Sequence, residues 1–277
     1  RFGLASATLF ACCLARGDRI LLPWRAQRWL MLQGSLTFCL SYLCTYHAEQ
    51  YVVSALVGVL FALMVFWTPL CNRIAFGTPL AWRTWAAGAV AMGGVILLFF
   101  HSISSAGQDI EAGGSARFVL GMALGLLATI AASAGNVLVV KIREESRNMF
   151  LTMAWAMFWG ALLVVLFCLL RGQAFVLPSA PRYWMGLIYL SLFGSVIAFN
   201  CYFTLINRIG AQKAVYIGVL TPVISVLLSI KLEHFRPGPL EWGGMALCLS
   251  SVAWALRAPH APDRQSPPSL AKTTSAT

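Results

Sequence analysis

The chain has 277 residues, of which 59% are hydrophobic and only 10% are charged, and its mean hydropathy is +0.77. Soluble domains carry about 25% charged residues, so the composition excludes an ordinary globular core and indicates a protein whose solvent is the lipid bilayer. The net charge of +11 comes without a basic run or stripe, which disfavours a nucleic-acid partner. The lysines and arginines instead lie between apolar segments, as membrane topology requires.

Nine uncharged stretches approach the roughly 20 residues that a helix needs to cross a bilayer. They cover residues 2–15, 29–46, 52–71, 85–100, 118–140, 149–170, 183–206, 214–230 and 242–256. Lipid cannot satisfy the open edges of strands, so these stretches predict helices. We therefore expect an all-α, polytopic membrane protein in which nine transmembrane helices are present.

The basic residues predict an orientation. If the segment after Ala15 is cytoplasmic, fourteen of the twenty lysines and arginines lie inside and six, Arg1 among them, lie outside. This bias predicts a cytoplasmic C-terminus. The loop that carries Asp109 and Glu111 then faces outward, and the Pro-, Ser- and Thr-rich residues 258–277 form a disordered cytoplasmic tail.

The sequence contains an internal repeat. A shift of 160 residues aligns several small, aromatic and turn residues, and a shift of 155 continues the match upstream. The aligned segments are Gly34-Ser35 with Gly194-Ser195, Tyr42 with Tyr202, Gly58-Val59-Leu60 with Gly218-Val219-Leu220, and Trp82 with Trp242. Residues 1–101 then form a first repeat of four helices, and residues 117–257 form a second repeat of five. The stretch 118–140 has no counterpart, so we expect the first of ten helices to be missing from this sequence.

Five helices in a repeat is an odd number, so the two halves must cross the membrane in opposite directions. Inverted repeats of this kind are typical of secondary transporters, because two halves related in the membrane plane can exchange outward- and inward-facing shapes.

At this level the chain resembles the EamA branch of the drug/metabolite transporter superfamily. In each half, a helix rich in small residues ends near a Gly/Pro turn, and a glycine-containing helix follows. The segments that carry the resemblance are Gly77-Thr78-Pro79-Leu80 with Gly88, Gly93 and Gly94, Pro237-Gly238-Pro239-Leu240 with Gly243 and Gly244, and Leu220-Thr221-Pro222-Val223. The resemblance implies a multi-pass carrier of the bacterial inner membrane that exports metabolites, amino acids or drugs. It also implies a solute cavity between the halves.

Polar side chains within the predicted spans are the candidates for that cavity: Gln33, Tyr42, Asn136, Asn200, Tyr202, Tyr216 and Thr221. They either bind a solute or hydrogen-bond across helices, since a buried polar group needs a partner. No acidic residue lies at mid-helix, which favours a neutral or zwitterionic solute over a cation.

Two glycines and two prolines are candidates for packing or bending. Gly58 and Gly218 are related by the repeat and could bring helices close together. Pro69 and Pro222 each remove a backbone hydrogen bond and could act as hinges.

The eight cysteines form no CxxC pair and lie in or beside apolar stretches. We interpret them as packing residues and expect no metal, disulfide or cofactor.

The sequence thus predicts a secondary transporter that exports a small neutral or zwitterionic metabolite, amino acid or drug by alternating access. It would work as a monomer or homodimer, with a small solute and the bilayer as its partners. A non-transporting scaffold or sensor remains an alternative and would lack a polar cavity between the halves. An intramembrane enzyme is disfavoured, because the spans show no His–Asp, HExxH or acidic pair.

Overall fold

The computed structural model describes residues 1–52, 54–78, 82–100, 104, 115–145, 148–172, 180–232 and 238–257. The predicted tail at 258–277 and the loop that carries Asp109 and Glu111 lie outside these residues.

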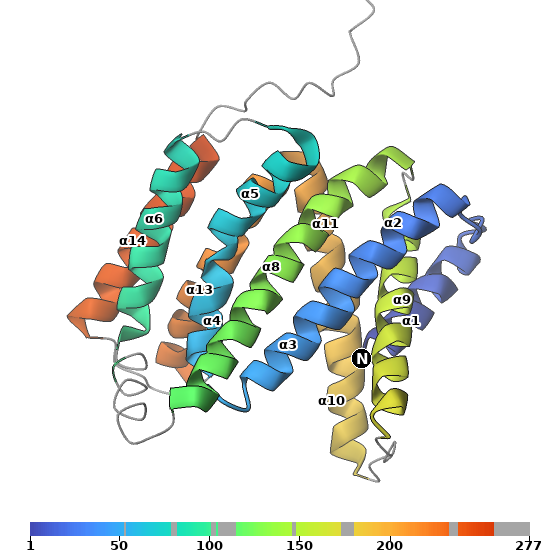
Figure 1. Cartoon of the computed structure of the whole chain (residues 1–277), viewed down its shortest axis with the longest axis horizontal. Coiled ribbons are helices and arrows are strands. Elements are labelled where there is room, and N and C mark those ends of the chain that lie inside the picture. The colour runs from blue at the N-terminus through green and yellow to red at the C-terminus, as the bar shows by residue number, and fades with distance from the viewer. Residues whose placement is uncertain are drawn as a thin grey trace, which may run out of the picture.

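In the described part of the chain the regular elements are helices, arranged as a bundle (Figure 1). The first half contains α1 (Phe2–Ala15), α2 (Trp24–Gly34), η1 (Ser35–Leu40), α3 (Ser41–Ala48), α4 (Ser54–Ala62), α5 (Met64–Phe76) and α6 (Trp82–Leu98). The second half contains α8 (Ser115–Glu145), α9 (Met149–Leu170), α10 (Pro181–Ser191), η3 (Leu192–Ile197), α11 (Ala198–Ile209), α12 (Ala211–Ala214), α13 (Ile217–Leu232) and α14 (Pro239–Arg257). Each of the nine predicted stretches falls on these helices, and α1 and α9 have the predicted bounds.

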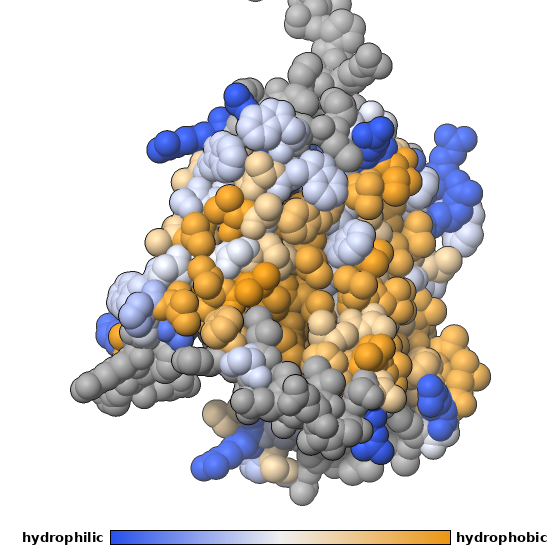
Figure 2. Space-filling model, turned by 60° about the vertical axis from the view of Figure 1, so that its left-hand side comes forward, coloured by the Kyte–Doolittle hydropathy of each residue, from blue (hydrophilic) through white to orange (hydrophobic). Residues whose placement is uncertain are grey.

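Five described helices are long and apolar enough to cross a membrane: Leu56–Phe76, Ala116–Arg143, Met149–Leu170, Pro181–Ile209 and Ala211–Leu228. Two shorter apolar helices, Phe2–Ala15 and Trp82–Leu98, accompany them. Figure 2 shows hydrophobic side chains across the middle of one face and hydrophilic ones towards its upper and lower ends. This distribution fits a bundle whose middle lies in hydrocarbon.

Repeat-related helices pack against each other in antiparallel directions. Along α6 and α14, the rings of Trp82 and Trp254 lie 6.4 Å apart, whereas Gly94 lies against Gly244. The residue number therefore rises along one helix as it falls along the other. A two-fold axis in the membrane plane would produce this pairing, so the packing agrees with the predicted inverted repeat.

The repeat-related pair α1 and α9 shows the same relation. The Arg16 guanidinium lies 4.5 Å from the ring centre of Phe150, and the rings of Phe10 and Trp155 are 5.2 Å apart. Here too the higher number on one helix meets the lower number on the other. Figure 1 shows both pairs side by side.

Small residues allow a close contact between α6 and α14. A Cβ atom on Gly94 would lie 2.9 Å from the carbonyl oxygen of Gly244, and a Cβ on Gly244 would lie 2.7 Å from that of Gly94. Gly58 and Gly218 differ, because a Cβ on either would meet nothing within 4 Å. We therefore assign this close packing to Gly94 and Gly244, and the packing role of Gly58 and Gly218 stays a prediction.

Both predicted prolines lie inside helices, Pro69 in α5 and Pro222 in α13. The helix that contains Pro69 is also interrupted near Leu63, where the amide of Phe66 donates to the Leu63 carbonyl at 2.9 Å. This shorter hydrogen bond tightens the turn between α4 and α5. The interruption supports a hinge here but does not test it.

Each half also contains a π-helical turn that the sequence analysis did not predict. The two turns are η1 (Ser35–Leu40) and η3 (Leu192–Ile197), and the repeat aligns Gly34-Ser35 with Gly194-Ser195. π-Helical turns are rare and frequently occur at functional sites. Their recurrence at corresponding places adds to the evidence for the repeat.

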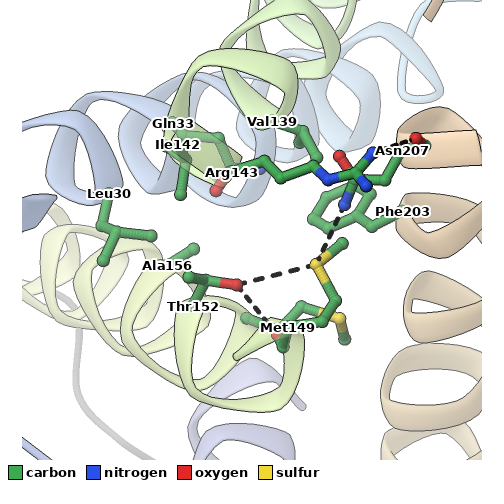
Figure 3. Close-up of a pocket in the computed structure, with 11 residues that line it drawn as sticks. Leu30, Gln33, Val139, Ile142, Arg143, Met149, Thr152, Ala156, Phe203 and Asn207 are labelled. Carbon is green, nitrogen blue, oxygen red and sulfur yellow. Dashed lines mark hydrogen bonds between the residues drawn. The ribbon is translucent and has the colours of Figure 1, made fainter. Parts of the chain in front are cut away.

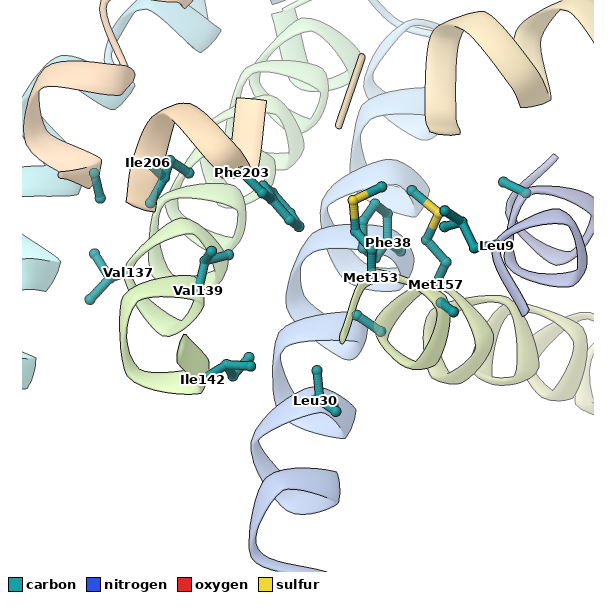
Figure 4. Close-up of a cluster of buried hydrophobic side chains, with 14 of the residues drawn as sticks. Leu9, Leu30, Phe38, Val137, Val139, Ile142, Met153, Met157, Phe203 and Ile206 are labelled. Atoms are coloured by element: carbon teal, nitrogen blue, oxygen red, sulfur yellow. The ribbon is translucent and has the colours of Figure 1, made fainter. Parts of the chain in front are cut away.

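The buried side chains form separate clusters. One joins α1, α2, α8, α9 and α11, and its members include Leu9, Phe38, Met153, Met157 and Phe203 (Figure 4). Another joins α6, α13 and α14 around Val95, Val219 and Met245. The long helix α8 contributes to both clusters and brings polar side chains between them.

Candidate functional site

A polar face runs along α8 inside the bundle. Thr129, Ser133 and Asn136 are spaced four and three residues apart, which places them on one side of the helix. All three are buried, and Ser133 is fully so. A polar face inside a membrane bundle needs partners, because hydrocarbon supplies no hydrogen bonds.

These partners come from helices of both halves. Thr68, on α5 of the first half, donates to the Ser133 hydroxyl at 3.2 Å, and both residues are fully buried. Asn136 donates through Nδ2 to the hydroxyl of Tyr202, on α11 of the second half, at 2.9 Å. The polar face of α8 therefore lies where the two halves meet.

The first half also reaches α8 through Thr37 on η1. A Cβ on Gly135 would overlap the Thr37 hydroxyl oxygen, so only glycine allows this approach. The same hydroxyl accepts a 3.3 Å hydrogen bond from Nε2 of Gln33. This contact joins the polar face to the residues of a pocket.

The pocket lies between α2, α8, α9 and α11, at the end of the bundle that carries Asp18, Arg143 and Arg208 (Figure 3). We call this end the basic end. The pocket encloses about 410 Å³, including the part open to the surroundings. Its lining consists of Leu30, Gln33, Val139, Ile142, Arg143, Met149, Thr152, Met153, Ala156, Phe203 and Asn207.

Two buried amide oxygens in this lining have no hydrogen-bond partner among the described residues: Gln33 Oε1 and Asn207 Oδ1. Gln33 is only 1% exposed, and Asn207 uses its Nδ2 to donate to the Met149 sulfur at 3.4 Å. A buried acceptor without a donor costs about 1–3 kcal/mol. Two such acceptors in one pocket indicate a place for a ligand that carries donors.

The structure brings three of the predicted cavity residues to this region. Gln33 lines the pocket, and Asn136 and Tyr202 bind each other on the polar face.

It places the other four predicted residues away from the pocket lining. The Tyr42 ring lies 5.5 Å from the Arg1 guanidinium, and Asn200 is half-buried on α11. Tyr216 is buried and donates to the Thr84 carbonyl at 3.4 Å. Thr221 is exposed and donates to the carbonyl of Ile217 on its own helix at 2.9 Å.

Several pocket residues were not predicted from the sequence, above all Arg143 and Asn207. Arg143 entered the sequence analysis only as a topological charge, and Asn207 lies at the end of its span. The sequence did contain a signal for both residues. Asn207 lies next to the end of a predicted span and Arg143 lies three residues after one, and a long polar side chain at such a position can reach the mouth of a cavity.

The expected place of Arg1 in an outside loop is wrong. Its guanidinium donates to the Ser195 hydroxyl and to the Gly194 carbonyl, each at 2.8 Å. Ser195 stands midway between Pro181 and Ile209, the ends of one continuous span. Arg1 therefore lies at mid-depth, and the predicted outside count falls from six basic residues to five.

Among the described residues no group of three or more His, Cys, Asp or Glu could hold a metal ion.

The described residues form an all-helical bundle with membrane-length apolar helices and buried polar groups between its halves, which is typical of a multi-pass membrane transporter. Residues 1–100 and 119–257 match the EamA-like transporter family, and the chain belongs to this family.

Curated relatives carry transporter names. The chain is 26% identical over 254 residues to the uncharacterized inner membrane transporter YedA of Escherichia coli K12, covering 91% of this chain and 78% of that protein. It is 23% identical over 208 residues to a probable amino-acid metabolite efflux pump of the same organism, covering 72% and 66%. These names and the apolar helices support a multi-pass protein of the bacterial inner membrane.

A solved structure has the same fold. A chain of known crystal structure superposes with a TM-score of 0.70 at 19% identity, covering 92% of this chain and 84% of that one.

Proposed function

We propose that the protein is a secondary transporter that exports a small neutral or zwitterionic organic solute by alternating access. The observation that carries this proposal is the polar face of α8, whose partners Thr68 and Tyr202 come from opposite halves. An interface that must open and close benefits from polar contacts that can be exchanged, whereas a static scaffold has no need of them.

The proposed orientation in the membrane rests on the distribution of basic residues, and the proposed direction of transport rests on the name of one relative. With the basic end in the cytoplasm, fourteen basic residues lie inside and five outside, as the positive-inside rule favours. The pocket then opens to the cytoplasm, where an exporter collects its solute. One relative is named as an efflux pump, which supports the outward direction. Both halves are in one chain, so a monomer suffices for alternating access.

Transport by the purified chain in proteoliposomes tests the proposal. We expect saturable counterflow of neutral or zwitterionic solutes, and little counterflow of organic cations. Asn136→Leu should abolish counterflow, whereas Thr221→Val, which changes an exposed hydroxyl, should preserve it. If the folded protein transports none of a broad panel of metabolites, amino acids and drugs, the proposal fails.

A further inference from the structure

We propose that the pocket at the basic end binds the α-ammonium and carboxylate groups of an amino acid with an apolar side chain. Arg143 holds the carboxylate, and the amide oxygens of Gln33 and Asn207 accept hydrogen bonds from the ammonium group. The inference rests on the proposed transport function, for which it supplies the class of solute and the residues that recognise it.

Two buried amide oxygens in the pocket can accept hydrogen bonds from a ligand. The Gln33 amide is fixed through its nitrogen, which donates to Thr37 at 3.3 Å, and its oxygen is buried without a partner. Asn207 is fixed in the same way, with its nitrogen on the Met149 sulfur and its oxygen unpartnered. The two residues stand on opposite walls, α2 and α11, and both side chains face the pocket (Figure 3). Both amides therefore present acceptors to a ligand, and a group with several N–H donors would fill them.

Arg143 supplies the opposite chemistry. Among the described residues that line the pocket it is the only ionisable one, and its Nη1 donates to the backbone oxygen of Asn207. This contact holds the guanidinium beside Asn207 (Figure 3) and uses one of its five N–H donors. The planar group can bind a carboxylate through two parallel hydrogen bonds.

The charges of the lining select among solutes. Among the described lining residues a cation would meet Arg143 and no carboxylate, so it is disfavoured. An anion would satisfy Arg143 but would leave the oxygens of Gln33 and Asn207 without donors, which is costly. A zwitterion offers both a carboxylate for the guanidinium and N–H donors for the amide oxygens, and it adds no net charge to the site.

The rest of the lining favours an apolar side chain. Seven lining residues are hydrophobic: Leu30, Val139, Ile142, Met149, Met153, Ala156 and Phe203. Methionine side chains adapt to ligands of different shape. The lining therefore favours an amino acid with an aliphatic or aromatic side chain over one with a polar side chain.

Direct binding to the full chain in lipid nanodiscs tests the proposal with three matched probes. L-Leucine is the zwitterion, N-acetyl-L-leucine lacks the ammonium group, and L-leucinamide lacks the carboxylate. We expect L-leucine to bind at least about tenfold more tightly than either analogue, because each analogue loses a hydrogen bond to a charged group. Equal or tighter binding of either analogue would overturn the proposal.

Variants of the pocket test which residue binds the carboxylate of the ligand and which residues bind its ammonium group. Arg143→Gln should weaken L-leucine about tenfold or more and remove the preference over L-leucinamide, while keeping the preference over N-acetyl-L-leucine. Gln33→Leu and Asn207→Leu should reduce the preference over N-acetyl-L-leucine. Thr221→Val, a change of an exposed hydroxyl outside the pocket lining, should leave these preferences intact.

A folding defect would not produce this pattern, since it lowers the binding of all probes together. Arg143→Lys keeps the charge and should restore part of the preference over L-leucinamide. If Arg143→Gln leaves that preference unchanged, the carboxylate does not bind Arg143 and the proposal is wrong.

The binding assay and the counterflow assay together separate this inference from the transport proposal. Counterflow of other solutes without selective L-leucine binding would overturn the inference and leave transport standing. Selective L-leucine binding without counterflow of any solute would support the pocket and overturn transport.

Discussion

The side-chain amide of Asn136 donates a 2.9 Å hydrogen bond to the hydroxyl of Tyr202, which joins α8 to α11 inside the bundle. The repeat-related tyrosine of the first half, Tyr42, instead lies beside the Arg1 guanidinium at 5.5 Å. Two tyrosines at corresponding positions thus have different partners. The contact between Asn136 and Tyr202 is therefore a property of one half, and it can be removed without changing its counterpart.

A double-mutant cycle measures this contact. Asn136→Leu and Tyr202→Phe should show a coupling energy of about 0.6 kcal/mol, the average for hydrogen bonds between membrane helices. The measurement is the unfolding free energy in bicelles of the two single variants and the double variant. Thr221→Val serves as a control that should not couple to Tyr202→Phe. Strictly additive effects of the first pair would contradict the contact.

The packing of α6 on α14 should fail when Gly94 gains a methyl group. In Gly94→Ala the new Cβ would lie 2.7 Å from the Cys248 sulfur and 2.9 Å from the Gly244 carbonyl oxygen. Overpacking of this kind costs about 1–3 kcal/mol, so the midpoint of thermal unfolding in detergent should fall. The neighbour Gly93 is the matched control, because a Cβ there meets nothing within 4 Å. Gly93→Ala should be neutral or stabilising, and equal losses in both variants would refute the close contact.

Asn148 should contribute to stability in two separable ways. Its Oδ1 accepts from the Leu151 amide at 3.3 Å and caps α9, and its Nδ2 donates to the Asp18 carboxylate at 2.8 Å. Asn148→Ala removes both contacts and should cost about 1 kcal/mol or more. Asn148→Ser can keep the cap but not the bond to Asp18, so its cost should be smaller. Chemical unfolding in micelles checks the order, and a serine variant as unstable as the alanine variant would argue against the cap.

The orientation of the protein in the membrane can be measured by labelling single introduced cysteines in a variant whose eight native cysteines are replaced. Arg19→Cys follows α1 at the basic end, and Arg171→Cys follows α9 at the opposite end. A membrane-impermeant maleimide added to intact spheroplasts should label the second and spare the first. Inverted vesicles should give the reverse result. Labelling of Arg19→Cys from outside would place the basic end, and with it the pocket mouth, outside the cell.

The helices and the repeat were predictable because charged and turn residues delimit the apolar stretches. The bounds of α1 and α9 follow from Arg16 and from Asn148 and Arg171, which are costly to bury in lipid. The inverted repeat followed from the aligned glycines and aromatics together with an odd number of helices.

Which face of each helix points inward was less predictable. A helix that is apolar all round gives no hydrophobic periodicity, so Thr221 and Asn136 looked equivalent in the sequence. The structure exposes Thr221 and buries Asn136.

The pocket residues Arg143 and Asn207 were harder still to find, because they stand at span ends. A sequence assigns such positions to loops, whereas packing of α8 against α11 turns both of them toward the same space.

The two π-helical turns belong to the helices that carry the two unpartnered amides. Gln33 lies two residues before η1, and Asn207 follows η3 on the same continuous helix. A π-turn stores one residue beyond the α-helical spacing, so it can migrate along a helix while both ends of that helix stay anchored. Each residue that it passes rotates by about 100°, one residue's share of a 3.6-residue turn. Migration of η1 toward the N-terminal end of α2 would therefore rotate the Gln33 side chain away from the proposed solute site. Release of the solute would then begin with this local change in helical hydrogen bonding, before any large movement of the bundle.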